Sequence, residues 1–510
     1  MKRKIIALPL ALMILVLSAC AGMGGAPQQE PAPAPTPQQQ APAAADPAAP
    51  AEAATDGIGS PDAPVHVTVL FRDPVDEEAA IIRAIEEGMA RQGNFVTIEF
   101  LEPPAGNYNE VVPIAFRTGT INPDILWFQA GHLPLGQEGL FEDLTPYIAN
   151  SYHVRTMLEP HSIARLESFP YMLFLAPIRI QVPVIRTDWL NQLESGSALL
   201  ADPTVDNWLE LMRELVSSGL ADYAITIDGN MQRLDSIFNH AFGVTGSFMR
   251  DSDGNWISSM ISDAERDKLA FFAQLYAEGL LDPEFITNDW QVMEQRFYGG
   301  EVGIIAGGAG AVTQIYNDRM VELHGPEASL TLLPPARGVG HALRSLDVTM
   351  EDRGFVINRD SPQYVKDAAF AIFEFMASPE GRILDLVGIE GMNYEVVDNM
   401  IDITNIRMHP VFWHTINNLE AHMPFRDGNP FEGAFMESIR LTQDYFHPDT
   451  NIILPAEFMP IWDSLLSSYR EFVVDVIRGL RSADDMDALR EQWNAFGWPD
   501  VQAWLNENLQ

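Results

Sequence analysis

Residues 122–128 read NPDILWF, and this stretch decides the fold class because it completes an alternating order of strands and helices. Apolar residues at every second position predict a strand over residues 65–71, and a second strand is predicted over 95–101. Helical spacing of apolar residues predicts helices over 76–91 and 108–117. The order β-α-β-α-β predicts a parallel sheet, whose ligands bind beyond the carboxyl ends of the strands.

The rest of the chain continues the mixture of helices and strands. Ser262-Asp263-Ala264-Glu265 predicts a capping box at the start of a helix, and Gly279 is the expected end of that helix. Strands are predicted over residues 303–306 and 354–357. Ser361-Pro362 is expected to open another helix with Pro at its first position. The C-terminal part is predicted to be helical, so the fold class is α/β.

The N-terminus has the features of a secretion signal. The basic start MKRK (1–4) precedes the apolar run 5–17, which is shorter than the roughly 20 residues that a membrane-spanning helix needs. The following LSAC (17–20) resembles the lipobox of bacterial lipoproteins, and Cys20 is the single cysteine of the chain. We expect a lipoprotein signal peptide at 1–19 and lipidation of Cys20. The alternative is an ordinary cleaved signal with an incidental cysteine.

Residues 20–61 are expected to form a disordered tether that starts at the lipidated Cys20. They are rich in Ala, Pro and Gln and hold almost no bulky apolar side chain. Such a segment cannot bury enough surface to offset its ordering entropy. No other run approaches transmembrane length. The expected location is therefore the cell membrane, with a lipid-anchored body on the extracytoplasmic side.

The composition narrows the classes of ligand. A formal net charge of −40 argues against nucleic acid as a partner, because phosphate contacts need a positive surface. The chain also holds 10 Trp, and an acidic protein rich in aromatic residues suits neutral polyhydroxylated ligands.

Several motifs, in this order, resemble the extracellular solute-binding proteins of family 1. They are GLFEDLTPYI (139–148), IRTDWL (185–190), LYAEGLLDPEF (275–285), FMASPEG (375–381) and GIEGMNY (388–394). These proteins are the lipoprotein receptors of ABC-type sugar importers, and the likeness is strongest to the large subgroup associated with oligosaccharide uptake. It extends over residues 62–510, and its strength lies in the number and order of the motifs.

The resemblance implies a periplasmic-binding-protein-like type II fold, with two α/β lobes joined by a hinge and a ligand cleft between them. Lobe one is expected to comprise 62–177 plus 350–400, and lobe two 178–345 plus 401–510. The implied function is the capture of a carbohydrate, an oligosaccharide by preference, and its delivery to the permease subunits of an ABC transporter. The protein would be a monomer without cofactor or enzymatic activity.

Sugar recognition needs flat apolar faces for stacking and planar polar groups for hydroxyl hydrogen bonds. By resemblance, the first half of the cleft and the hinge would contribute Trp127, Phe128, Gln129, His132, Arg179 and Gln181. Core packing is an equal alternative for Trp127. Phe128 and Gln129 point in opposite directions if the strand persists, and Arg179 and Gln181 share a face that could instead be surface.

Lobe two would contribute candidates of the same residue types, namely Gln232, Arg233, Asp235, Trp290, Trp413 and Trp462. Core packing is the favoured alternative for Trp462. Many relatives carry an aromatic residue after a glycine at the position of Gly307-Gly308-Ala309-Gly310, and this chain has none there. Stacking at that position is therefore not expected.

Other chemistries find little support in the sequence. Asp251-Ser252-Asp253-Gly254-Asn255 departs from a calcium loop in the position of its glycine and reads as a hairpin turn. The glycines at 307–310 do not make a dinucleotide fingerprint, and the histidines lack metal spacing. Two alternatives stay open: a binding protein for peptide, polyamine or metal, and a membrane-tethered glycan-active enzyme whose carboxylates have no fixed spacing.

Overall fold

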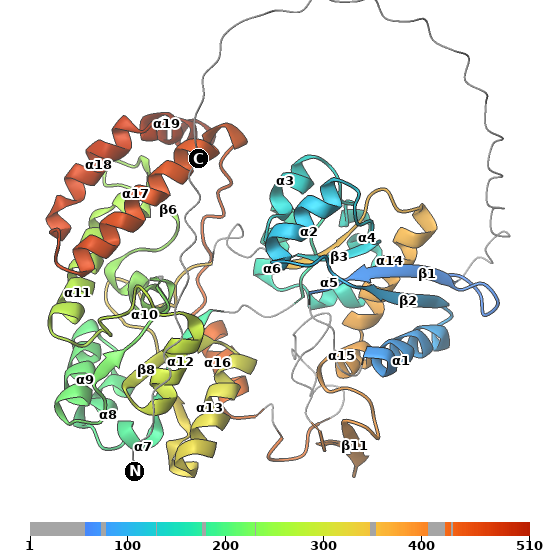
Figure 1. The fold of residues 1–510 in the computed structure, drawn as a ribbon, viewed down its shortest axis with the longest axis horizontal. Helices are drawn as coiled ribbons and strands as arrows, with labels where there is room; N and C mark the ends of the chain where they lie inside the picture. Colours follow the sequence, from blue (N-terminus) through green and yellow to red (C-terminus); the bar gives the residue numbers. More distant parts are fainter. Residues whose placement is uncertain are drawn as a thin grey trace, which may run out of the picture. The chain divides into compact units, whose positions relative to one another are not determined.

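The computed structural model describes residues 57–72, 78–128, 130–175, 180–229, 231–346, 353–405, 424–429 and 432–509 (Figure 1). The chain divides into two units, Met1–Glu52 and Ala53–Gln510, and all described residues belong to the second. The predicted signal peptide and Cys20 lie outside the described residues, as does nearly all of the predicted tether.

The first sheet has four strands in the order β10-β3-β1-β2. Its strands and the helices between them are β1 (Val65–Leu70), α1 (Glu78–Arg91), β2 (Val96–Leu101), α2 (Tyr108–Arg117), β3 (Ile125–Phe128) and β10 (Gly354–Ile357). Strand β1 runs parallel to β2 and β3, which confirms the predicted parallel order. Strand β10 is antiparallel to β3 and places Phe355 opposite Trp127.

Helices cover both faces of the first sheet (Figure 1). They include α3 (His132–Gln137), α4 (Thr145–Asn150), α5 (His153–Met157), α6 (Pro160–Ser168), α14 (Gln363–Ala377) and α15 (Pro379–Leu386). One core contains Ile125 and Trp127 of β3 together with residues of α1 and α14. The other contains Leu126 and Phe128 together with residues of α2 and α3. Because side chains alternate along a strand, β3 is buried on both faces.

The start of α14 corrects a prediction in detail. Pro362 is the N-cap residue, with an extended ψ of 147°, and the helix begins one residue later than expected. The Ser361 hydroxyl donates to the Asp124 carboxylate at 2.6 Å and does not cap the helix. The helix packs its core face through Ala369, Phe373 and Met376, which are fully buried.

The second sheet also has four strands, in the order β5-β8-β4-β9. They are β4 (Gln181–Arg186), β5 (Tyr223–Ile225), β8 (Val302–Gly308) and β9 (Leu330–Leu332). Strand β8 is parallel to β5 and antiparallel to β4. Its surrounding helices are α7 (Thr187–Leu190), α8 (Glu194–Ala201), α9 (Val205–Ser217), α10 (Gln232–Phe242), α11 (Asp263–Ala277), α12 (Trp290–Gly299) and α13 (Ala311–His324).

The second sheet is again buried on both faces. Ile304 of β8 lies in one core with residues of α9 and α10, and its neighbour Ile305 lies in another core with residues of α12 and α13. This alternation is the same device that buries β3 in the first sheet. The domain limits inferred from the family resemblance stay a prediction.

The described residues of the C-terminal part are largely helical, as predicted. The helices are α16 (Ala434–Asp444), α17 (Met459–Ile477), α18 (Met486–Ala495) and α19 (Trp498–Asn508). Residues of α17, α18 and α19 join the core that contains Ile304. The strands β6 (Phe248–Arg250) and β7 (Trp256–Ser258) pair antiparallel, which confirms the hairpin predicted at 251–255. A further antiparallel hairpin joins β11 (Tyr394–Val397) and β12 (Met400–Ile403).

The capping box at the start of α11 is confirmed only in its first half. The Ser262 hydroxyl accepts the backbone N–H of Glu265 at 3.0 Å. The Glu265 carboxylate is buried and faces Lys268 and Tyr469, so it does not return to the helix start. The predicted end at Gly279 is confirmed, with a positive φ of 71°. Among the described helices, none has the length and apolar character that a membrane crossing requires.

Candidate functional site

The carboxyl ends of β5 and β8 lie at one edge of the second sheet, because the two strands are parallel. Asp228 follows β5 closely, and Gly308 ends β8. Gln181 begins β4 and lies directly opposite Gly308 in the antiparallel register. This edge is where α/β sheets bind ligands, so the side chains that gather there form the candidate site.

Arg233 is the central charged residue of this edge. It comes from the first turn of α10 and is only 3% exposed. Its guanidinium donates two hydrogen bonds to the Asp228 carboxylate, at 3.0 and 3.1 Å, and a third to the backbone carbonyl of Ala306 in β8. A bidentate pair of this kind fixes both side chains and neutralises the buried charge.

Trp290 provides an aromatic surface beside this ion pair. The Arg233 guanidinium carbon lies 4.7 Å from the centre of the Trp290 ring, a cation–π distance. Trp290 is the first residue of α12, whose start is capped by the Asp289 carboxylate accepting the Val292 N–H at 2.8 Å. The residue is 39% exposed, so part of it faces solvent while Arg233 beside it is buried.

Glu294 and Tyr316 complete the surroundings of Trp290. The centre of the Tyr316 ring lies 6.2 Å from that of Trp290. Burial raises the pKa of the Glu294 carboxyl, and the Arg233 guanidinium opposes that shift. Burial also raises the pKa of the Tyr316 phenol, with the Glu294 charge adding to it. We call Asp228, Arg233, Trp290, Glu294 and Tyr316 the Arg233 cluster.

The Arg233 cluster combines a partly exposed aromatic ring with planar hydrogen-bonding groups. The ring offers an apolar face, the carboxylates accept hydroxyl hydrogens and the guanidinium donates. Such a combination can hold a polyhydroxylated molecule by stacking and paired hydrogen bonds.

The structure brings three of the predicted site residues to this edge: Gln181, Arg233 and Trp290. The Gln181 side-chain oxygen accepts a hydrogen bond from Arg344 at 3.4 Å. Gln232 is half-buried at the start of α10. Asp235, two residues beyond Arg233, instead pairs with Lys268 at 2.6 Å, so it belongs to a different set of contacts.

The predicted residues of the first sheet lie in its interior. Trp127 and Phe128 are each 1% exposed, and the Trp127 ring packs against Phe355 with centres 4.8 Å apart. His132 is also 1% exposed, and its Nδ1 lies 3.1 Å from the Tyr171 hydroxyl. These placements correspond to core packing, which was the alternative left open for Trp127. We therefore assign no ligand contact to Trp127, Phe128 or His132.

Trp462 lies among the C-terminal helices, half-buried against the large core. Its ring centre is 5.2 Å from that of Phe248 and 6.2 Å from that of Trp493. This is the core packing that the sequence favoured as the alternative. The remaining predicted residues, Gln129, Arg179 and Trp413, lie outside the described residues.

Sequence reasoning missed Asp228, Glu294, Tyr316 and Phe71. Phe71 directly follows β1, is half-buried and has its ring centre 5.6 Å from that of Trp127. The rule about strand carboxyl ends marks Phe71, the last residue of the strand predicted over 65–71, and it would mark Asp228 only after a strand is recognised at residues 223–225. No local signal marks Glu294 or Tyr316, because they meet Trp290 only through tertiary packing.

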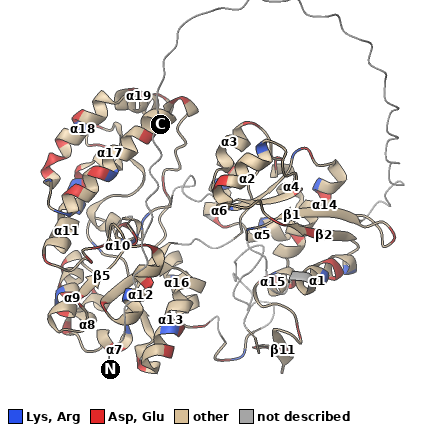
Figure 2. Cartoon of the chain, in the orientation of Figure 1, with Lys and Arg blue, Asp and Glu red and all other residues tan. Residues whose placement is uncertain are grey.

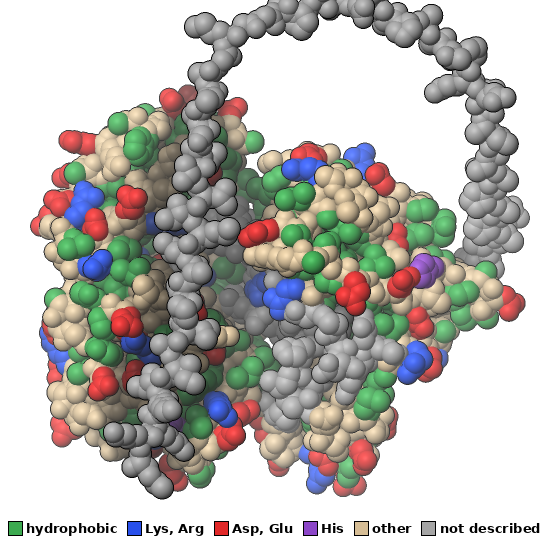
Figure 3. Space-filling model, viewed as in Figure 1, with side chains coloured by type: hydrophobic (Ala, Val, Ile, Leu, Met, Phe, Trp, Pro, Cys, Tyr) green, Lys and Arg blue, Asp and Glu red, His purple; other side chains and the backbone are tan. Residues whose placement is uncertain are grey.

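The charge of the chain does not favour a polyanion. Figure 2 shows more acidic than basic residues on the helices, in line with 71 Asp and Glu against 31 Lys and Arg. On the face drawn in Figure 3, basic side chains are scattered singly or in small groups. Across the ranges that the structure describes, no three His, Cys, Asp or Glu side chains are grouped to hold a metal ion.

Comparison with known proteins identifies the family. The family model described as bacterial extracellular solute-binding protein matches residues 75–383, more than half of the chain. Lipoprotein LipO of Bacillus subtilis (strain 168) is 22% identical over 381 residues, which cover 68% of this chain and 71% of that protein.

Two solved structures illustrate the shared fold. The N-glycan transport solute binding protein NgtS from Streptococcus pneumoniae has a TM-score of 0.63 at 14% identity, covering 87% of this chain and 97% of that one. The alginate-binding protein AlgQ2 has a TM-score of 0.59 at 18% identity, with the same two coverages. These proteins have the type II periplasmic-binding-protein fold, so the predicted fold class is confirmed. The chain therefore belongs to the bacterial extracellular solute-binding proteins, the family that serves ABC importers.

Proposed function

We propose that this protein captures a carbohydrate, an oligosaccharide in particular, outside the cytoplasm and delivers it to an ABC importer. The observation that carries the proposal is the Arg233 cluster, in which a 39% exposed Trp290 adjoins the ion pair of the buried Arg233 with Asp228 at the strand carboxyl ends. Family membership supports the binding role, and the similar proteins NgtS and AlgQ2 are described as N-glycan transport and alginate-binding proteins.

The proposed binding mode follows from the chemistry of the cluster. The exposed part of Trp290 stacks against the apolar face of a sugar ring, while the carboxylates of Asp228 and Glu294 accept hydrogen bonds from its hydroxyl groups. Because Arg233 and Asp228 already neutralise each other, the site favours a neutral sugar over an anionic one. Gln181 lies at the same sheet edge and adds an amide for hydroxyl recognition.

Capture is proposed to involve two lobes, one built on residues 62–177 plus 350–400 and the other on 178–345 plus 401–510. Closing of the lobes about a hinge would bury the sugar and present a distinct form to the importer. In this scheme, Phe71 replaces the buried Trp127 as the aromatic contribution of the first sheet.

The proposed anchor is a lipid on Cys20, with the tether 20–61 holding the body at the extracytoplasmic face of the membrane. A tethered monomeric receptor stays at high effective concentration near its membrane partner, which favours delivery. Similarity to a protein described as a lipoprotein supports this part of the proposal.

Calorimetric titration of the purified full-length protein with neutral and acidic oligosaccharides tests the proposal. We expect one neutral glycan series to bind. In an unfolding experiment, a ligand at 100 times its Kd should add about 2.7 kcal/mol to the free energy of unfolding. Chromatography of the glycan after incubation should show it unchanged. Binding only of a peptide, an amine or a metal ion, or turnover of the glycan, would refute the proposal.

Trp290→Ala should weaken sugar binding about tenfold or more, since it removes the stacking surface. Trp256→Ala is the matched control, because Trp256 also forms a cation–π contact with an arginine. The Arg250 guanidinium lies 4.5 Å from the centre of the Trp256 ring in the β6–β7 hairpin. If the two variants bound sugar with equal affinity, the Arg233 cluster would not be part of the binding site.

A further inference from the structure

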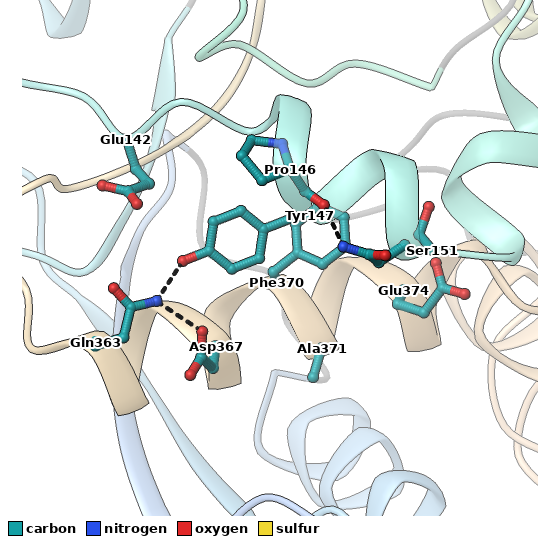
Figure 4. A pocket seen from close by; sticks show the side chains of 10 residues that line it. Glu142, Pro146, Tyr147, Ser151, Gln363, Asp367, Phe370, Ala371 and Glu374 are labelled. Atoms are coloured by element: carbon teal, nitrogen blue, oxygen red, sulfur yellow. Dashed lines mark hydrogen bonds between the residues drawn. The ribbon is translucent and has the colours of Figure 1, made fainter.

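A cavity of about 570 Å³ lies among the helices of the first sheet, apart from the Arg233 cluster (Figure 4). Its walls come from helix α4, the residues on either side of that helix, and one side of α14. The volume is within the range of roughly 300–1,000 Å³ typical of small-molecule sites. None of the proposed sugar-binding residues lines it.

Tyr147 of α4 forms the aromatic part of the wall. Its ring lies against Phe370 of α14, with ring centres 5.1 Å apart and an interplanar angle of 31°. The amide of Gln363 donates to the Tyr147 hydroxyl and to the Asp367 carboxylate, both at 2.8 Å. Figure 4 shows this chain of hydrogen bonds along one side of the cavity. Gln363 thus links the Tyr147 hydroxyl to the Asp367 carboxylate.

Three carboxylates line the same cavity: Glu142, Asp367 and Glu374. Lys366 pairs with Glu142 at 3.0 Å and so compensates one of them. The Glu374 carboxylate accepts the backbone N–H groups at the start of α5, at 2.7–2.9 Å, and is fixed by them. More acidic than basic groups thus surround the ring.

The titration of Tyr147 agrees with a negative environment. Burial raises the pKa of its phenol, the hydrogen bond from Gln363 opposes the shift, and the charges of Glu142 and Asp367 add to it. A negatively charged phenolate is disfavoured beside these carboxylates, and a positive charge would be favoured in the same place.

We propose that this cavity binds a small organic cation that carries a primary ammonium or guanidinium group. A cation placed over the Tyr147 ring gains cation–π attraction, and carboxylates at the rim provide charge-assisted hydrogen bonds. An anion would be repelled. A neutral molecule of the same shape would lose both electrostatic contributions. The site is separate from the proposed sugar site and does not depend on it.

Calorimetric titration of the purified full-length protein with agmatine, which carries both an ammonium and a guanidinium group, tests the inference. We expect saturable binding of agmatine, about tenfold weaker in Tyr147→Leu and in Asp367→Asn, because each removes one of the two attractions. Tyr147→Phe keeps the ring and should retain most of the affinity. Butylurea, a neutral analogue, should bind far more weakly than agmatine.

Asp360→Asn is the matched charge control. It removes an exposed carboxylate close to α14 that does not line the cavity. Equal weakening by Asp360→Asn and Asp367→Asn would show attraction to the acidic surface in general and would overturn the inference. So would equal affinity for butylurea, or absence of agmatine binding by the folded wild-type protein. Sugar titrations on the same variants should be unchanged, which separates this result from a failure of the proposed function.

Discussion

Helix α10 carries two ion pairs that start only two residues apart and differ in what surrounds them. Arg233 pairs with Asp228 beside Trp290, which is 39% exposed. Asp235 pairs with Lys268, and Lys268 also lies 2.9 Å from Glu265. The first pair lies at a sheet edge next to a partly exposed ring, whereas the second joins α10 to α11.

The pair of Asp235 and Lys268 is part of a larger network of hydrogen bonds and ion pairs around Lys268. The Tyr469 hydroxyl of α17 donates to Glu265 at 2.6 Å, and Lys268 also donates to the Asn239 side chain at 2.7 Å. Burial alone would lower the pKa of Lys268, but the charges of Asp235 and Glu265 outweigh it and raise that pKa. The network joins α10, α11 and α17. The comparison teaches that one side of α10 is built for stability, whereas the other carries residues of the proposed sugar site.

Lys268→Met should give the largest loss of stability. It leaves Asp235 and Glu265 without their cation, and breaking a buried pair in this way costs about 3–5 kcal/mol. The midpoint of urea unfolding should fall accordingly, while the sugar affinity of the folded fraction should not change.

Arg319→Met serves as the control for that loss. Arg319 also forms an ion pair, with Glu322 on α13, but both side chains are exposed. Such a pair contributes about 0–1 kcal/mol, so the unfolding midpoint should change little. If both variants were equally stable, the network around Lys268 would not have the structural role assigned to it.

The two ion pairs of α10 also show what the sequence could and could not predict. The strand at 354–357 and the helix at 108–117 were predicted within one residue, because their apolar period is a local property. The role of Lys268 was not predictable, since its partners Asp235 and Asn239 lie 33 and 29 residues away and its position on a helix is otherwise that of a surface lysine. Trp127 was ambiguous for a related reason, because only the placement of helices on both faces of β3 decides that its ring is buried.

His240, in the last turn of α10, should make the free energy of unfolding depend on pH, with an effect of intermediate size. Burial lowers the pKa of this residue to about 4, with the nearby His447 adding to the shift. The unfolded chain, with a pKa near 6.5, therefore binds a proton more readily than the folded chain. The stability due to neutral His240 is complete above about pH 6.5, and it decreases as the pH falls toward 4, by about 2–3 kcal/mol.

Urea unfolding of the wild type and of His240→Gln between pH 7 and pH 4 measures this effect. The variant lacks the titrating group, so the difference between the two proteins should change over that interval and be constant above it. A difference that does not vary with pH would contradict the assignment to His240. The effect should leave sugar binding at pH 7 unaltered, because His240 contacts Ser345 and His447 and not the Arg233 cluster.

Arg233→Lys bears directly on the Arg233–Asp228 pair, and we expect it to change binding more than stability. Lysine keeps the positive charge but cannot donate two parallel hydrogen bonds to Asp228 or lie flat on Trp290. We expect sugar affinity to fall about tenfold, because the orientation of Trp290 and Asp228 is lost, with a smaller loss of stability than in Lys268→Met. Titration calorimetry and urea unfolding measure the two quantities.

Arg250→Lys provides the control for the arginine–tryptophan contact itself. Arg250 lies on Trp256 as Arg233 lies on Trp290, but in the β6–β7 hairpin and without a carboxylate held in the same manner. Its replacement should leave the sugar affinity unchanged. If Arg233→Lys also bound sugar with wild-type affinity, the ion pair at the sheet edge would be a structural feature like the one around Lys268, and the contrast between the two sides of α10 would not mark a binding site.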